Sequence, residues 1–80
     1  MYLDTESVKQ LLSAALPGCK IEVEGGSGKY LLTAVGKAFE GLNAVKRQQL
    51  IYGVLNSHIS SGEIHAVTMR LYTDDEFNAG

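Results

Sequence analysis

The first part of the chain shows two hydrophobic patterns in succession, one with the spacing of a helix and one with the alternation of a strand. Five apolar residues recur at the three- and four-residue spacing of one helix face: Val8, Leu11, Leu12, Ala15 and Leu16. Asp4 or Thr5 can cap this predicted helix, and Pro17-Gly18 ends it. Beyond it, Ile21 and Val23 alternate with charged residues, which predicts a strand with one solvent-exposed face.

A glycine-rich turn separates that strand from a second one. Gly25-Gly26-Ser27-Gly28 can supply positive φ angles wherever a hairpin needs them. Residues 30–35 are apolar on both sides except at Thr33, which is typical of an inner strand, and Gly36 ends the run. The turn also matches a bare GxxG pattern. Because a GxxG loop that clamps nucleic acid is expected to join two helices, we interpret the segment as a hairpin turn.

A long helix is predicted after a loop that ends at Asn43, its expected cap. Four apolar residues share one face of this helix: Ala44, Ile51, Leu55 and Ile59. Gly53 inside it costs about 0.5–1 kcal/mol relative to alanine, so it marks either close packing against the sheet or a break between two shorter helices. Ser60-Ser61-Gly62 stops the helix.

Residues 64–71 predict a third strand, whose odd-numbered face carries His65. Thr73 and Glu76 then form a capping-box pattern for a short last helix. The element order is αββαβα, and a helical connection between the second and third strands favours a right-handed crossover with those strands parallel. The prediction is a single α+β domain over residues 1–80, in which helices pack on one face of a mixed three-stranded sheet.

Composition narrows the environment and the class of partner. The net charge of −2 gives no general attraction to nucleic acid. No run approaches the ~18–20 apolar residues of a membrane span. The N-terminal residues lack the basic and apolar regions of an export signal, and a single cysteine, Cys19, excludes an internal disulfide. We therefore expect a cytoplasmic protein that does not insert in a membrane.

No arrangement of side chains predicts an enzyme. Ser57 and His58 are neighbours on a helix, so their side chains diverge by about 100° and cannot act as a dyad. Asp74, Asp75 and Glu76 form a carboxylate cluster whose position favours the N-terminus of the last helix over acid–base chemistry.

Metal ligands are scarce, comprising Cys19, His58 and His65. A structural zinc site or an iron–sulfur cluster needs four ligands, so a partner would have to supply the rest. His65 is the best candidate because it lies at a strand start beside a glycine-containing loop. The alternative is a histidine packed and hydrogen-bonded in the core. His58, late in its helix, is interpreted as a solvated C-terminal residue.

A small group of cations suggests a second kind of site. Lys46 and Arg47 stand near a helix start with Lys37 close in sequence, and together they could contact phosphates. An ordinary solvated helix face explains the same residues.

Several short motifs follow one another in a recognisable order: Phe39-Glu40-Gly41, Val45-Lys46-Arg47-Gln48-Gln49, Ile51-Tyr52-Gly53, Ile64-His65-Ala66-Val67, Leu71-Tyr72-Thr73 and Asp75-Glu76-Phe77. Their order and spacing resemble the BolA family, particularly its short bacterial IbaG/YrbA-like branch. The resemblance implies an αββαβα fold related to class II KH domains. It also implies partnership with a monothiol glutaredoxin, with which BolA proteins share a [2Fe–2S] cluster.

The resemblance places the cluster-binding histidine at His65. The family usually offers a second ligand, Cys or His, in the loop between the first two strands, but here Lys29 stands in the approximate place and a protonated lysine cannot bind iron. Cys19 lies before the first strand and is a weaker candidate for the second ligand.

Three functional hypotheses follow. The first is a non-enzymatic adaptor that binds a monothiol glutaredoxin and helps hold a bridging [2Fe–2S] cluster, in iron–sulfur trafficking or stress response. The second is a nucleic-acid-binding regulator that uses the KH-like fold with Lys37, Lys46 and Arg47. The third is a glutaredoxin-binding module that carries no metal.

Overall fold

A computed structural model describes residues 2–79 and shows the predicted order of elements. The elements are α1 (Thr5–Ala15), β1 (Lys20–Gly26), β2 (Lys29–Val35), the 3₁₀ turn η1 (Lys37–Phe39), α2 (Ala44–Ser60), β3 (Ala66–Tyr72) and α3 (Asp74–Ala79). Asp4 caps α1 by accepting a hydrogen bond from the Ser7 N–H, and Asn43 caps α2 in the same way from the Lys46 N–H. Both caps were predicted.

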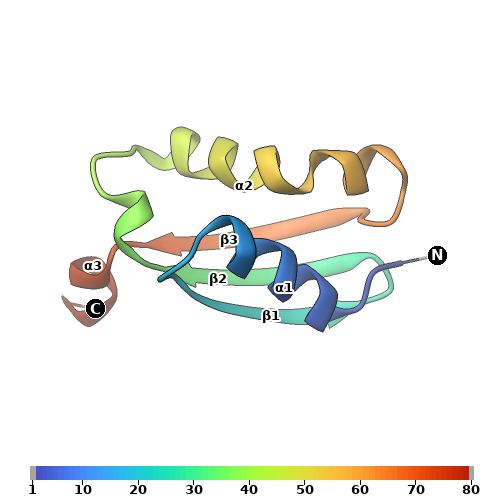
Figure 1. The fold of residues 1–80 in the computed structure, drawn as a ribbon, viewed down its shortest axis with the longest axis horizontal. Helices are drawn as coiled ribbons and strands as arrows, with labels where there is room; N and C mark the ends of the chain where they lie inside the picture. Colours follow the sequence, from blue (N-terminus) through green and yellow to red (C-terminus); the bar gives the residue numbers. More distant parts are fainter. Residues whose placement is uncertain (1, 80) are drawn as a thin grey trace.

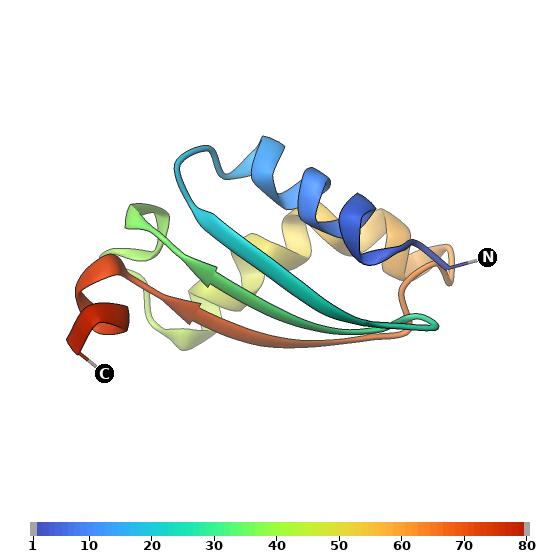
Figure 2. The same ribbon diagram turned by 90° about the horizontal axis from the view of Figure 1, so that it is seen from below.

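The sheet has the order β1-β2-β3, with β1 antiparallel and β3 parallel to the central strand. This is the predicted mixed three-stranded sheet, and α2 forms the crossover between the parallel strands. Figure 1 shows that the N-terminus, the β1–β2 turn and the α2–β3 loop lie at one end of the molecule, while α3 lies at the other. Turned by 90°, Figure 2 shows the three strands side by side with α2 behind them.

The core lies between the two long helices and one face of the sheet. Its buried members from the helices are Val8, Leu12, Ile51 and Leu55, and those from the strands are Ile21, Tyr30, Leu32 and Ala34. Leu16, the C-cap of α1, is buried with them. Sequence periodicity did not predict that Phe39 belongs to this set, because it lies in a segment expected to be a plain loop. The η1 turn places its ring fully inside the core, at 0% exposure.

Two boundaries differ from the sequence prediction. β3 begins at Ala66 rather than Ile64, because Ile64 donates its N–H to the His58 carbonyl and does not join the ladder. α2 runs unbroken through Gly53, and no described atom lies within 4 Å of the position that a Cβ would take there. Gly53 therefore marks neither a break nor a close contact within this chain.

Candidate functional site

His65 lies immediately before β3, and it is exposed. Its backbone N–H donates to the Gly28 carbonyl at 2.7 Å, which ties it to the β1–β2 turn. The preceding residue, Ile64, is buried, so the backbone at this point is anchored from one side and presents the imidazole on the other. The imidazole packs against the Tyr2 ring with centroids 4.8 Å apart and planes at 87°.

The turn beneath His65 depends on glycine. Gly26 pairs with Lys29, which leaves Ser27 and Gly28 as a two-residue loop with φ angles of 53° and 83°. Positive φ at both positions is the hairpin geometry that matches strand twist. A Cβ on Gly28 would come within 2.7 Å of the Tyr2 ring and 3.3 Å of His65 Cγ. The Tyr2 and His65 rings therefore pack directly against the backbone of Gly28, where a side chain would not fit.

The segment before α1 is pinned to this end of the sheet. The Tyr30 hydroxyl donates to the Leu3 carbonyl, and the Leu3 N–H donates to the Glu63 carbonyl at 3.4 Å. The Glu63 carboxylate in turn contacts His58 Nδ1 at 2.9 Å, and this contact, followed by a bond from Ser61, lowers the pKa of Glu63. His58 is thus half-buried and paired, whereas the sequence predicted a solvated residue.

The structure separates Cys19 from His65. Cys19 stands next to Gly36 at the start of β1, whereas His65 lies beside the turn that follows the end of that strand. Seven strand residues at about 3.3 Å each put the two ends roughly 20 Å apart, so both side chains cannot bind one cluster within a single chain. Lys29 is exposed at the His65 end.

No group of three or more His, Cys, Asp or Glu side chains able to hold a metal occurs among residues 2–79. The donor set on this side of the molecule therefore fits a contribution of one imidazole to a shared cluster, with the other ligands from elsewhere. It does not fit a cluster held by this chain alone.

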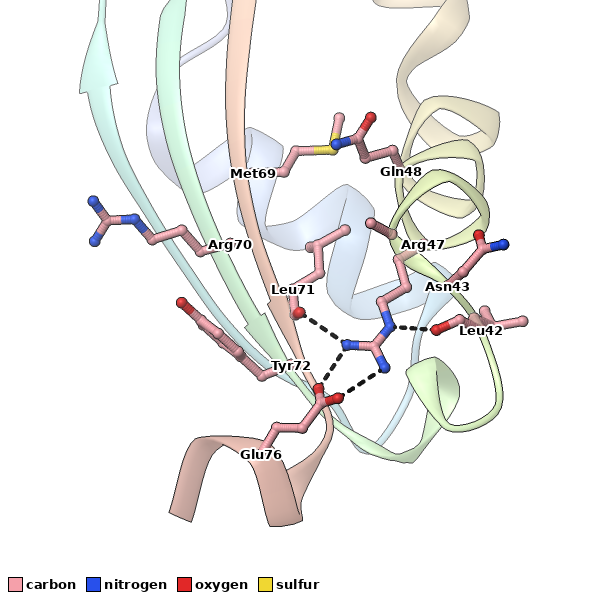
Figure 3. A pocket seen from close by; sticks show the side chains of 10 residues that line it. Leu42, Asn43, Arg47, Gln48, Met69, Arg70, Leu71, Tyr72 and Glu76 are labelled. Atoms are coloured by element: carbon pink, nitrogen blue, oxygen red, sulfur yellow. Dashed lines mark hydrogen bonds and ion pairs between the residues drawn. The ribbon is translucent and has the colours of Figure 1, made fainter. Parts of the chain in front are cut away.

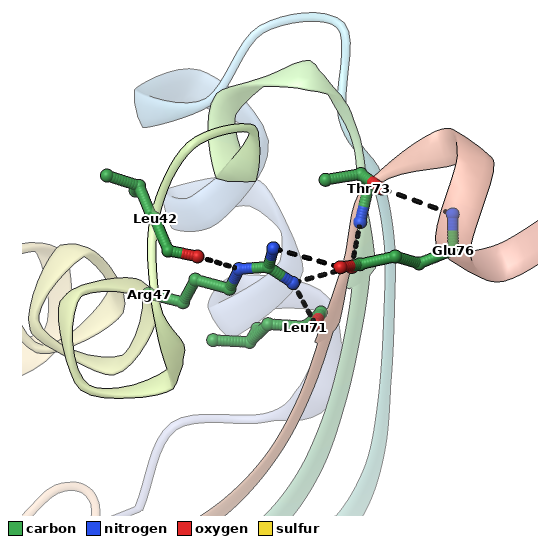
Figure 4. Close-up of polar contacts among 5 residues, drawn as sticks. All are labelled: Leu42, Arg47, Leu71, Thr73 and Glu76. Carbon is green, nitrogen blue, oxygen red and sulfur yellow. Dashed lines mark hydrogen bonds and ion pairs between the residues drawn. The ribbon is translucent and has the colours of Figure 1, made fainter.

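Arg47 is engaged inside the molecule. Its guanidinium donates to the Leu42 carbonyl at 2.9 Å, to the Leu71 carbonyl at 3.2 Å and to both carboxylate oxygens of Glu76 at 2.6 and 3.1 Å (Figure 4). These contacts join the start of α2 to the end of β3 and to α3. The predicted capping box is also present, since Thr73 N–H donates to Glu76 and Glu76 N–H donates to the Thr73 hydroxyl.

The electrostatic consequence appears at Glu76. Its pKa falls to about 2, mainly because Arg47 hydrogen-bonds to its carboxylate and next because of the Thr73 backbone N–H. The same pairing raises the pKa of Arg47. Sequence reasoning found the capping box but missed Arg47, because a partner 29 residues away leaves no local pattern.

A groove of about 520 Å³ opens beside this ion pair, between the first turn of α2 and the end of β3 (Figure 3). Arg47 lines this groove, and the charge of its guanidinium is already neutralised by the ion pair with Glu76. Lys37 and Lys46 are exposed, so the three cations grouped by the sequence are not equivalent. Arg47 connects elements of the fold, and the two lysines are left as solvent-exposed charges.

Comparison with known proteins decides the family. The model of the family described as BolA-like protein matches residues 7–76. The chain belongs to the BolA family. Among BolA relatives, it is 44% identical over 75 residues to an uncharacterized protein of the rpoN-murA intergenic region of Acinetobacter guillouiae, with 94% of this chain and 90% of the relative covered. It is 33% identical to the acid stress protein IbaG of Escherichia coli K12, with 94% and 89% covered.

The structure of a BolA homologue from Coxiella burnetii superimposes on this BolA domain with a TM-score of 0.82 at 31% identity, covering 95% of this chain and 97% of that one. The fold and the family implied by the sequence motifs are therefore confirmed. No helix in the described part of this BolA chain is long and apolar enough to cross a bilayer.

Proposed function

We propose that this chain is a non-enzymatic adaptor that binds a monothiol glutaredoxin and supplies His65 as one ligand of a bridging [2Fe–2S] cluster. The carrying observation is the exposed imidazole of His65, held on a glycine turn at one end of the sheet. A histidine buried in the core could not reach iron held by another polypeptide. His65 is exposed, so its imidazole is accessible to a partner.

The surroundings of His65 support a shared cluster. With Cys19 about 20 Å away along the strand and a lysine in the neighbouring turn, this chain offers one imidazole where a cluster needs four ligands. Histidine can replace thiolate as a ligand of a [2Fe–2S] centre. Because the visible bands of such a cluster come from charge transfer between ligand atoms and iron, ligation by His65 would change its electronic spectrum. The relative named as an acid stress protein supports a role in stress response.

The test is anaerobic reconstitution of a monothiol glutaredoxin with iron and sulfide, followed by titration with this chain. Visible circular dichroism should change on addition of the wild type and remain unchanged on addition of His65→Ala. Two matched controls remove the other candidate ligands: Cys19→Ala and His58→Gln should both reproduce the wild-type change. An unchanged spectrum with wild type, or an identical change with His65→Ala, would refute the proposal.

The same titration, followed by calorimetry, distinguishes cluster sharing from the alternative in which this chain binds the glutaredoxin without any metal. Calorimetry that detects a complex of equal affinity for the wild type and His65→Ala, with no spectral contribution from either, would select a glutaredoxin-binding module without metal. Because the guanidinium of Arg47 already binds Glu76 and two backbone carbonyls, the nucleic-acid alternative would depend mainly on the exposed Lys37 and Lys46.

A further inference from the structure

We infer that Tyr2 is a positioning residue for His65. This inference rests on the proposed role of His65 and extends it to a residue that no family motif marks. Tyr2 lies before the first helix, its side chain is 46% exposed, and its ring meets the imidazole edge to face.

The ring pair is seated on the turn. Both rings cover Gly28, which is itself buried although it occupies a hairpin tip. Any Cβ there would lie 2.7 and 2.8 Å from two carbons of the Tyr2 ring and 3.3 Å from His65 Cγ. The Gly28 backbone, the Tyr2 ring and the His65 imidazole are therefore in mutual contact at the turn.

Tyr2 can hold this place because the residue after it is fixed. The Leu3 carbonyl accepts the hydroxyl of Tyr30, a core residue of the central strand, and the Leu3 N–H reaches Glu63 in the α2–β3 loop. The two hydrogen bonds of Leu3 fix the segment before α1 across the His65 end of the sheet.

The physical effect of Tyr2 is to restrict the imidazole. A lone exposed histidine samples several rotamers, and a metal bridge has to select one of them at an entropic cost. An edge-to-face neighbour on one side and a glycine backbone beneath leave the ring fewer orientations, while the exposed side stays open to iron from a partner.

The experiment compares Tyr2→Ala, Tyr2→Phe and the matched control Tyr52→Ala, which removes another exposed tyrosine from α2. In the free protein, NMR measures nuclear Overhauser contacts and the side-chain rotamer of His65. We expect one dominant rotamer in the wild type, Tyr2→Phe and Tyr52→Ala, and rotamer averaging in Tyr2→Ala. In the glutaredoxin titration, Tyr2→Ala should weaken the cluster-bridged complex by about 2- to 12-fold, the range of an aromatic pair, and Tyr2→Phe should restore it.

A single fixed His65 rotamer in Tyr2→Ala would overturn the inference, as would a loss of complex affinity equal to that of Tyr52→Ala. The two proposals fail differently. If His65→Ala produces the same spectral change as the wild type, the ligand role fails, while the NMR comparison of His65 between Tyr2→Ala and the wild type still decides whether Tyr2 orients the ring.

Discussion

Gly36 follows β2 at a position where the backbone would accept any residue but the packing would not. Its φ of 171° is ordinary extended backbone, and its N–H donates to the Tyr72 carbonyl at 3.0 Å. A Cβ at Gly36 would lie 2.4 Å from Cys19 Sγ and 3.1 Å from both Cα and Cβ of the same cysteine. Gly36→Ala therefore forces an overlap without any change in backbone preference.

The cost follows from those distances. The sulfur of Cys19 comes closest and has to be displaced from its packed position, and the two contacts with Cα and Cβ remain after that, so β1 and the end of β2 must also separate slightly. Overpacking of this kind costs about 1–3 kcal/mol. In a domain of this size each 1 kcal/mol lowers the melting temperature by about 4–8 °C. We expect Gly36→Ala to melt roughly 4–24 °C below the wild type.

A double-mutant cycle measures the part of this loss that is due to the sulfur. Cys19→Ala alone should cost about 1 kcal/mol or less, because Cys19 is only half-buried and the substitution removes a single sulfur atom. In the Cys19→Ala background, Gly36→Ala should cost about 1 kcal/mol less than in the wild type. Urea unfolding followed by circular dichroism measures all four proteins. Equal costs in the two backgrounds, or a Gly36→Ala protein as stable as the wild type, would refute the packing argument.

Three further predictions concern the rest of the fold. Because the pKa of Glu76 is depressed to about 2, the ionised carboxylate contributes its full stabilisation above pH 4.5, and this stabilisation is lost as the pH falls from 4.5 toward 2. Between these pH values, the urea midpoint should fall less steeply for Glu76→Gln than for the wild type. Parallel curves for the two proteins would contradict the pairing of Glu76 with Arg47. Gly53→Ala should raise the free energy of unfolding by about 0.5–1 kcal/mol, because the helix position is open and the backbone is helical; a lower value in urea unfolding would reveal an unseen steric constraint. Leu55→Ala, at 0% exposure, should cost about 2–5 kcal/mol in the same assay, and a loss below 1 kcal/mol would mean that the core collapses onto the vacated space.

Local patterns predicted most of the fold. The first helix, indicated by the apolar spacing from Val8 to Leu16, the glycine turn and the capping box at Thr73 each carry a signal within a few residues, and all three occur in the structure. The parallel pairing of β2 and β3 followed from the handedness of the crossover. These features depend on neighbours in sequence, so periodicity and turn chemistry were sufficient.

Features that depend on distant partners were not predicted. Phe39 fills the core from a segment with no repeating pattern, and Arg47 meets Glu76 only after β3 has been placed between them. The family motif indicated His65, but nothing near the N-terminus indicated Tyr2, because its contact spans most of the chain. The exposed position of His65 likewise required the turn and the strand to be assembled.

Because β2 and β3 run parallel, both begin at the end where three backbone connections converge: the start of the chain, the hairpin turn and the α2–β3 loop. Two residues of the hairpin at this end, Ser27 and Lys29, are exposed, so their side chains are not part of the hydrophobic core. Replacement of either residue by cysteine or histidine would therefore add a thiolate or an imidazole on the His65 side of the sheet while the core stays as it is. Such an exchange would change the donor atoms available at this end of the molecule without changing how the chain folds.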